Sequence, residues 1–424
     1  MTQFSRLAPV ARRFLVVVAA VAAPTGFAPQ LSAQQPAAAP TVVTPAFDFS
    51  GVVFGSYSVR TDSAGKAGFG GSSPNAFNVD RAYLTFRMPA GDNGQVRVTT
   101  DIFQNQSAAT NGYYQGWAIR LKYAYLQYTA LRNNFGAGSS LVGRIGVLHT
   151  VVIDHQEGFW PRYLAQTAME RNGFFSSADA GVAGLLTLGD KLGEVYGTVT
   201  NGPGYTSYEK DRFKDFALRV SLTPFANSKD MNAVVKTFAI SPWVYKGYVG
   251  SAFAGGGAGQ VGSGTNGAVT DGMKRDRYGV FAGVKDRRLT AGAEWAQRSD
   301  ESEKGSNTAV APRTVTDSSG RLLDGFVILR PMEWIDGSRK SNLGLIARFD
   351  HYTPNTGPSS ANYAGNTPSY NYWVLGASYD LNQKITLALD WQKQTGTSFP
   401  TPTGTNVRPS PDNSNIFLHF QAIF

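Results

Sequence analysis

The residues most able to do chemistry in this chain are bases that recur on one face of strand-like segments. They are Arg81, Arg87, Arg97, Arg120, Lys122, Arg144, Arg219 and Arg348. A smaller set of acids shares that face: Asp101, Asp215, Glu294, Asp350 and Asp390. Because the bases outnumber the acids, a wall built from this face would raise the local concentration of anions through its electric field.

A second group of candidates lies between residues 149 and 177, a segment that is amphiphilic and rich in aromatic residues. If it folded into an enclosed space, Arg162 and Arg171 would be the candidates for contacting a passing anion, with Trp160 and Tyr163 as walls. The alternative is a loop that packs over a rim or in a subunit contact.

Other polar groupings do not add up to a catalytic or metal site. His149, Asp154, His155 and Glu157 are close in sequence, but we expect no helix there to set their spacing, so rim polar residues are the simpler interpretation. The pattern from Gly257 to Gly262 matches G-x-G-x-x-G without the strand and helix that a dinucleotide site needs. We therefore predict no metal and no cofactor.

An enzyme on a barrel wall stays open as a lesser alternative. His351 and His419 could serve such a site, but no G-x-S-x-G elbow occurs and no nucleophile is identifiable. The sequence therefore predicts no catalytic residue.

The composition narrows the classes further. Of 424 residues, 16% are charged, well below the roughly 25% of an average soluble protein, and 12% are aromatic. The aromatic content argues against intrinsic disorder. The absence of Cys excludes disulfides, Cys-ligated zinc, iron–sulfur centres and a cysteine nucleophile.

The N-terminus has the pattern of an export signal. Arg12 and Arg13 precede an apolar run from Phe14 to Ala23, which is too short for a transmembrane helix. We expect a signal peptide over 1–33 and a flexible leader over 34–45. The mature chain is then only mildly basic, so we expect no nucleic-acid partner.

The rest of the sequence alternates with a period of two residues, which is typical of strands. We predict sixteen strands, at 46–60, 76–89, 95–105, 118–130, 141–148, 178–188, 191–200, 213–223, 233–250, 276–285, 289–297, 321–332, 340–350, 369–380, 384–395 and 415–424.

The connections between these strands alternate strictly between long and short. A soluble sandwich gives no reason for such parity, whereas outer-membrane barrels have short periplasmic turns and long extracellular loops. We therefore predict an all-β fold: a transmembrane antiparallel β-barrel of about 16 strands over 46–424. About sixteen strands leave an aqueous channel, because side chains cannot fill a barrel of that size. Each inward Arg could also be ordinary lining balanced by a neighbouring acid.

The last strand supports closure of the barrel. Ile416, Leu418, Phe420, Ala422 and Phe424 share one apolar face. A terminal strand of this kind resembles the assembly signal of bacterial outer-membrane proteins, carried here by Phe424 and Phe420. Pairing with the first strand would remove an exposed edge.

Several short segments resemble the phosphate-selective porin O and P family of bacterial outer-membrane porins. They are Val79–Phe86, Lys122–Tyr128, Arg144–Val147, Glu170–Arg171, Asn201–Gly204 and Leu218–Phe225. The resemblance implies a sixteen-stranded homotrimeric channel in the bacterial outer membrane, with outer-membrane lipid and the barrel-assembly machinery as partners. It also implies that basic residues near the third loop set selectivity.

The sequence departs from that family where selectivity is set. Val147-Leu148-His149 replaces the residues that the family tends to place after Gly146, and the 149–177 segment lacks a Lys cluster. We therefore expect a general, non-enzymatic porin that passes small hydrophilic solutes with a modest anion preference. The alternatives are a channel selective for phosphate, polyphosphate or a sugar, and a barrel with a blocked lumen.

Overall fold

The computed structural model describes residues 48–68, 70–105, 116–209, 211–250, 272–304, 314–337, 340–354, 369–396 and 413–424. Contacts divide the chain after Thr44, and all described residues belong to the second unit. The predicted signal peptide, the leader and the segment from Gly257 to Gly262 lie outside the described residues.

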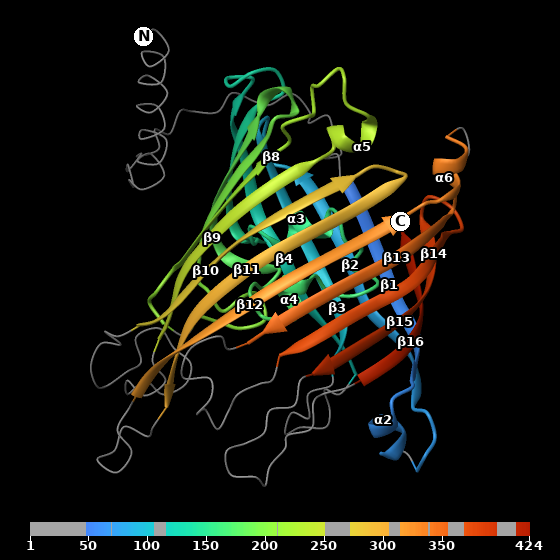
Figure 1. Ribbon diagram of the computed structural model, residues 1–424. Coiled ribbons are helices and arrows are strands. Elements are labelled where there is room, and N and C mark those ends of the chain that lie inside the picture. The colour runs from blue at the N-terminus through green and yellow to red at the C-terminus, as the bar shows by residue number, and fades with distance from the viewer. Residues whose placement is uncertain are drawn as a thin grey trace, which may run out of the picture. The chain divides into compact units, whose positions relative to one another are not determined.

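The described residues form one closed antiparallel barrel in which each strand pairs with its neighbours in sequence and β1 pairs with β16 (Figure 1). The strands are β1 (Asp48–Arg60), β2 (Asn75–Pro89), β3 (Gly94–Asn105), β4 (Gly116–Arg132), β5 (Ser140–His149), β6 (Ala178–Leu188), β7 (Gly193–Thr200), β8 (Asp215–Leu222), β9 (Ala239–Gly250), β10 (Gly272–Lys285), β11 (Leu289–Lys304), β12 (Thr314–Leu329), β13 (Leu343–Thr353), β14 (Tyr370–Asp380), β15 (Ile385–Gly396) and β16 (Asn413–Ile423). The predicted fold class is confirmed.

Among the described residues, short helical segments lie in the connections between strands. They are α2 (Ser63–Ala67), α3 (Ile153–Glu157), α4 (Ala168–Arg171), η3 (Gly189–Lys191), α5 (Ala233–Lys236) and α6 (Met332–Ile335). No helix within the described ranges is long and apolar enough to cross a membrane.

The seam between β1 and β16 completes the hydrogen bonding of the sheet. The register runs from Val52 opposite Ile423 to Arg60 opposite Asn415. Gly51 and Phe424 exchange backbone hydrogen bonds of 2.9 and 3.0 Å. Because hydrocarbon offers no partner to a free amide, closure of this kind is what allows strands to span a membrane.

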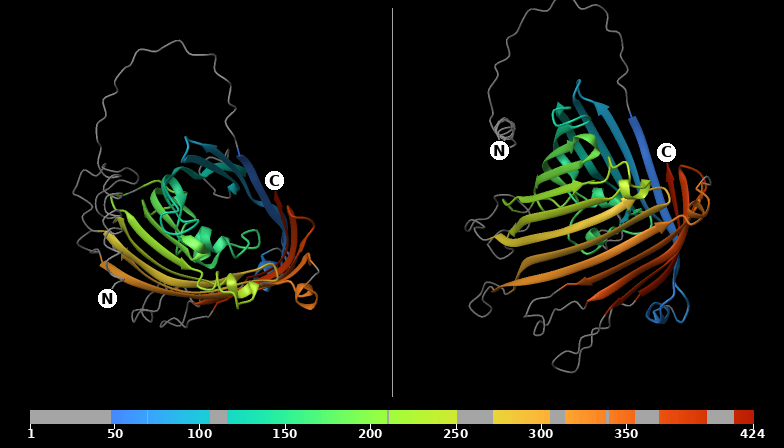
Figure 2. Two further views of the ribbon diagram at one scale, coloured as in Figure 1. Left: turned by 90° about the horizontal axis from the view of Figure 1, so that it is seen from above. Right: turned by 45° about the horizontal axis from the view of Figure 1, so that its top comes forward.

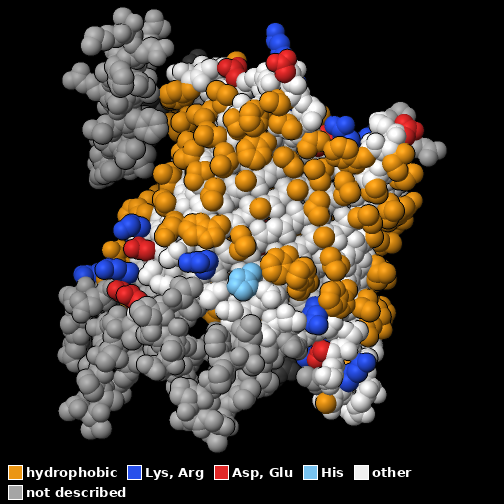
Figure 3. Space-filling view, in the orientation of Figure 1, with side chains coloured by type: hydrophobic (Ala, Val, Ile, Leu, Met, Phe, Trp, Pro, Cys, Tyr) orange, Lys and Arg blue, Asp and Glu red, His pale blue; other side chains and the backbone are white. Residues whose placement is uncertain are grey.

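The outer surface carries the apolar residues expected of a lipid-facing wall. Along β4, Trp117, Ile119 and Leu121 are 57%, 69% and 50% exposed. Figure 3 shows apolar side chains spread over the middle of the visible face, with charged side chains gathered toward its two ends. Along each strand the apolar side chains therefore face outward and the polar side chains face inward, which is the inverse of a soluble sandwich.

Three register shifts interrupt this alternation in the described sheet, and two of them place an extra residue on β2 and on β4, the strands on either side of β3. Between β1 and β2 the register shifts at Phe54 and Gly55, which leaves Asp80 as the extra residue next to Arg81. Between β3 and β4 it shifts at Thr99 and Thr100, which leaves Lys122 as the extra residue next to Tyr123. Bulges re-aim side chains; here Lys122 and Tyr123 are both buried although they are adjacent in sequence.

Some predicted boundaries were wrong. The predicted strand 233–250 begins only at Ala239, because residues 233–236 form α5, whose first turn is capped by the Asn232 side chain accepting from the Val235 amide at 3.0 Å. The predicted strand 321–332 ends at Leu329, before α6.

The strict parity of connection lengths was wrong for the same reason. The connections 223–238 and 330–342, which contain α5 and α6, are both longer than 305–313, which belongs to the long-loop end. The chain direction still places these helices at the end with the short turns, opposite α2 (Figure 1).

Candidate functional site

The segment 149–177 folds into the barrel and carries α3 and α4. In the view along the barrel it lies inside the ring of strands (Figure 2). Wall residues of β15, β13 and β11 donate to its carbonyls: Gln392 to Leu164 at 2.9 Å, Arg348 to Gln166 at 2.7 Å and Arg298 to Asn172 at 3.2 Å. The segment is therefore fixed to the β9–β15 side of the interior.

Trp160 is buried and anchors this loop. The sequence suggested that Trp160 would form a wall of an open passage, which this burial does not allow. It is 1% exposed, and its ring lies 5.3 Å from that of Phe326 and 4.7 Å from the Arg348 guanidinium. Its indole N–H donates to the Ala165 carbonyl at 2.9 Å. The Trp160 ring is therefore packed inside the protein, and its single N–H donor is hydrogen-bonded. Tyr163, in contrast, borders a cavity.

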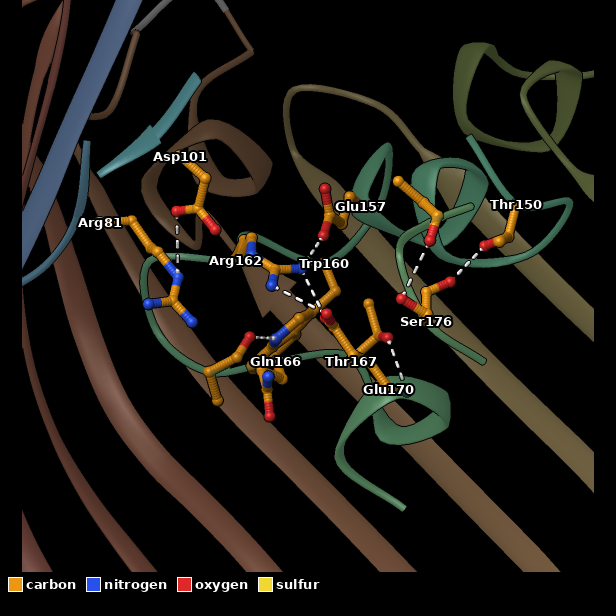
Figure 4. Close-up of polar contacts among 12 residues, drawn as sticks. Arg81, Asp101, Thr150, Glu157, Trp160, Arg162, Gln166, Thr167, Glu170 and Ser176 are labelled. Carbon is orange, nitrogen blue, oxygen red and sulfur yellow. Dashed lines mark hydrogen bonds and ion pairs between the residues drawn. The ribbon is translucent and has the colours of Figure 1, made fainter. Parts of the chain in front are cut away.

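Arg162 does not offer a free positive charge. Its guanidinium contacts Glu157 and binds Glu170, with Nη2 donating to Oε1 at 3.0 Å (Figure 4). The Thr167 hydroxyl caps α4 by accepting from the Glu170 amide at 3.3 Å, which holds the carboxylate in place. The sequence could not indicate this pairing, because both acids appeared only as members of the same loop.

Arg171 is held by aromatic faces on β14. Its guanidinium carbon lies 3.4 Å from the centroid of the Tyr372 ring and 5.6 Å from that of Tyr370. It also donates to the Gln394 side chain. This contact closes the C-terminal part of the loop against the wall.

The opposite wall carries a carboxylate shared by two bases. Asp101 is fully buried and accepts from Arg120 Nε at 2.9 Å, while Arg81 Nε lies 3.5 Å from its other oxygen. Arg120 also lies 4.0 Å from the centroid of the Phe103 ring and donates to the Tyr205 hydroxyl at 3.1 Å. Figure 4 shows Arg81 and Asp101 across from the Arg162 network.

Three further bases predicted on this face are held by neutral partners. Arg97 donates to Thr99 and lies 4.7 Å above the Tyr123 ring. Arg144 binds the Gln127 side chain at 3.1 Å. Lys122 lies 4.2 Å above the Tyr83 ring. Within the described part of the chain, none of these three bases has a carboxylate in ion-pair range.

The remaining predicted bases have acidic partners. Arg219 pairs with Glu194, Arg348 with Asp350 at 2.7 Å and Arg87 with Asp48 at 3.2 Å. The other predicted acids also have partners: Asp215 accepts from the Tyr248 amide, Glu294 from the Trp243 indole and Asp390 pairs with His419.

Two cavities lie between the loop and this wall. One, of about 450 Å³, is bordered by Arg81, Arg120, Tyr205, Arg275 and Arg277, among others. The second, of about 390 Å³, is bordered by Asp80, Arg81, Arg162, Tyr163 and His419, among others. Both cavities are bordered by Arg81 and Gln166, so they adjoin at these side chains.

Sequence reasoning missed Arg275 and Arg277 at this site. The two alternate on β10, but the predicted strand began at residue 276 and so broke the pattern. Arg277 pairs with Asp300 at 2.9 Å, and Arg275 has no ion pair among the residues described here. Tyr205 was missed because it lies in a connection, where alternation gives no signal.

The histidines do not assemble into one centre. His149 lies 3.4 Å from Asp154 and His155 approaches Ser241 at 2.9 Å, while His351 approaches Asn371 on the barrel wall. The described residues contain no group of three His, Asp or Glu side chains suited to a metal ion.

The sequence matches no family model and no curated protein. The structure, however, is similar to solved bacterial outer-membrane proteins. An anion-selective porin from Comamonas acidovorans has a TM-score of 0.54 at 9% identity, covering 89% of this chain and 99% of the other. The outer-membrane channel DcaP of Acinetobacter baumannii has a TM-score of 0.55 at 14% identity, covering 89% and 97%.

A third similar structure is the trimer form of OmpT, an outer-membrane protein of Vibrio cholerae, with a TM-score of 0.51 at 11% identity, covering 89% and 99%. These identities show the fold alone and do not single out the phosphate-selective family. The sixteen-stranded barrel, its apolar outer wall and its charged interior together establish a transmembrane barrel of the porin fold, located in the bacterial outer membrane.

Proposed function

We propose that this protein is an outer-membrane porin that passes small hydrophilic solutes by passive diffusion. The observation that carries the proposal is the inward loop 149–177, which leaves two adjoining cavities bordered by charged side chains. A barrel of this size holds an aqueous interior. A loop fixed to one side of it narrows the path and leaves the remaining path polar.

We propose a modest preference for anions. Arg97, Lys122 and Arg144 are held by aromatic and amide groups in place of acids, so their charges are not cancelled locally. Arg162, in contrast, is offset by Glu157 and Glu170. A preference for anions is expected because the surplus of positive charge lies on the barrel wall. The preference is modest because the loop contributes little net charge.

A non-enzymatic role fits the geometry better than catalysis. His419 pairs with Asp390 at 3.0 Å, and His351 lies between Asn371 and Thr353. The Thr353 hydroxyl lies 3.2 Å from His351, but neither residue borders one of the two cavities described above. The proposal assigns both to the structure of the wall and includes no cofactor.

We further propose a homotrimer assembled by the barrel-assembly machinery, with Phe424 and Phe420 as its recognition signal. A trimer form has been described for one similar structure, OmpT of Vibrio cholerae. Residues 1–33 would be the signal peptide that directs export.

Single-channel recording of the refolded mature chain in a planar bilayer tests the proposal. Ohmic conductance steps with a reversal potential of anionic sign under a KCl gradient are expected. Block by low concentrations of phosphate would favour a selective channel instead. A correctly folded barrel that never conducts would contradict a porin function.

A further inference from the structure

The outward face of the barrel changes from apolar to polar along four neighbouring strands, β12 to β15. Going away from the end with the short turns, the last apolar outward residues are Leu323, Phe349, Trp373 and Trp391. The next outward residues, which we call the outer polar row, are Arg321, His351, Asn371 and Lys393. Their facing follows from the alternation of the strands, because the residues between the two sets are buried: Leu322, Asp350, Tyr372 and Gln392.

The outer polar row is continuous across the strands. His351 lies directly opposite Asn371, with His351 Nδ1 2.7 Å from Asn371 Oδ1. The register makes Arg321 and Lys393 diagonal neighbours of this pair, one at each end. Figure 3 shows basic side chains and a histidine in the lower half of the visible face, on the outside of the barrel.

The fixed charges of the row are those of Arg321 and Lys393. The other ring nitrogen of His351, Nε2, lies 3.2 Å from the Thr353 hydroxyl, so both ring nitrogens have neutral partners. Among the described residues, neither Arg321 nor Lys393 takes part in an ion pair.

The surroundings of the two bases are neutral as well. Their cross-strand neighbours are Gln297, Thr353, Trp373 and Ser414. The next outward residues along β12 and β15 are Ser319, Leu323, Trp391 and Thr395. None of these neighbours is acidic. On β9, in contrast, the outward Lys246 has Asp276 at 3.9 Å. The protein therefore leaves the positive charge of the row without a counter-charge.

The position of the row identifies what can supply that counter-charge. His351, Asn371 and Lys393 lie near the ends of β13, β14 and β15 that are opposite the short turns. Because short turns face the periplasm in such barrels, the row faces the outer leaflet. Trp373, which is 38% exposed, and Trp391 border it, as aromatic residues do where hydrocarbon meets headgroups. Beyond a lipid-facing wall, the next groups that a lipid presents are the phosphates of its headgroup.

We propose that the outer polar row binds the phosphate groups of a lipid headgroup in the outer leaflet, with Arg321 and Lys393 as the charged contacts. Their long side chains can lie along the wall while their charged ends reach the headgroups. The two strands are three spacings apart, roughly 14 Å at about 4.8 Å per spacing, so a headgroup with two separate phosphates can engage both bases. The inference rests on the membrane location of the barrel and not on what passes through its interior.

Native mass spectrometry of the refolded barrel, released from a phosphate-free non-ionic detergent, tests the site by counting bound lipids. The probes are diphosphoryl lipid A and monophosphoryl lipid A, which share their acyl chains and differ by one phosphate. We expect the parent chain to bind the diphosphoryl form more tightly. Arg321→Gln and Lys393→Gln should each weaken that binding about fivefold, whereas Arg321→Lys and Lys393→Arg should retain it because they keep the charge.

Lys246→Gln is the matched control, because it removes an outward base that is 73% exposed and has an acidic neighbour. Equal affinity for the two lipids, unchanged in the doubly substituted Arg321→Gln/Lys393→Gln chain, would overturn the site. Loss of an oligomer in the double variant with unchanged lipid affinity would assign the row to a contact between copies instead. Heat-modifiable mobility checks folding, and single-channel conductance of the double variant should equal that of the parent, because the row faces away from the interior.

Discussion

Arg162 shows how a single base inside the barrel can be neutralised by its own loop. Its partners Glu157 and Glu170 both lie within the same segment, and its side chain is 11% exposed. The net charge beside the solute path therefore depends on the two carboxylates as much as on the Arg162 guanidinium.

Glu170→Gln keeps the volume and hydrogen-bonding capacity of the side chain and removes one negative charge. We expect the chloride-to-potassium permeability ratio to rise about twofold, because Arg162 is then paired with Glu157 alone and the net charge of the three side chains changes from −1 to 0. The reversal potential measures it. Asp276→Asn, on a side chain that is 45% exposed, is the matched control. A lower anion preference in Glu170→Gln would contradict the assigned balance of charges.

For individual residues, alternation in the sequence predicts which face of a strand a side chain occupies, but not which side chain it pairs with. Alternation predicted that Arg120, Asp101 and Glu294 share the inward face; in the structure Arg120 pairs with Asp101, and Glu294 accepts from Gln156 of the loop. It could not indicate that Asp101 is shared by two bases, because cross-strand and cross-barrel distances depend on register. It also could not foresee the bulge at Lys122, since a bulge leaves no periodic signal.

Among the elements, the loop 149–177 depends on a few buried anchors. Trp160→Ala should leave a cavity beside Phe326 and cost about 3–5 kcal/mol of packing free energy within the loop. Because the strands do not depend on that ring, we expect the barrel to remain folded while the loop loosens. Single-channel traces should then show more noise and additional conductance levels. Trp117→Ala, on the outer wall, is the control, and quiet traces in Trp160→Ala would contradict the role of the anchor.

The connection after β1 depends on pH through Asp62. The Arg60 side chain donates to this carboxylate, and the amides of Gly65 and Ser414 donate as well, which together hold the pKa of Asp62 well below its ordinary value. Because the pKa of Asp62 is lower in the folded state, this carboxylate stabilises the fold at pH values above its unfolded pKa of about 4. That stabilisation is lost as the pH falls toward the folded pKa.

Amide hydrogen exchange tests this prediction. Protection of Gly65 and Ser414 should stay constant between pH 8 and about 4 once the intrinsic exchange rate is corrected, and should fall on further acidification. Asp62→Asn should show reduced protection already at neutral pH. Equal protection in both proteins at neutral pH would exclude a role for this carboxylate in joining β1 to β16.

All sixteen predicted strands are present in the order expected, because alternation over many residues is a strong signal. The ends were less predictable. Val234 and Val235 continue an apolar pattern, but the Asn232 cap starts a helical turn there instead. The course of the 149–177 segment could be suggested from its amphiphilic composition, whereas the anchors that fix it come from strands far away in sequence.

At the scale of the whole molecule, pairing between the first and last strands closes the barrel. Phe424 exchanges hydrogen bonds with Gly51, and a Cβ on Gly51 would lie 2.3 Å from the Phe424 ring. We expect Phe424→Ala to lower the yield of heat-modifiable, folded barrel severalfold in cells, because both the seam and the proposed assembly signal lose the ring. Phe216→Ala, on an outward side chain that is 55% exposed, is the control. An unchanged yield for Phe424→Ala would argue against an assembly role.

The central claim is that the barrel encloses an open, polar path beside the inward loop. The most direct measurement is the current through single refolded barrels in a planar bilayer under a KCl gradient. We expect stable ohmic steps with a reversal potential that shows a modest excess of chloride over potassium permeability. Folded barrels that carry no current, or that strongly favour potassium, would contradict it.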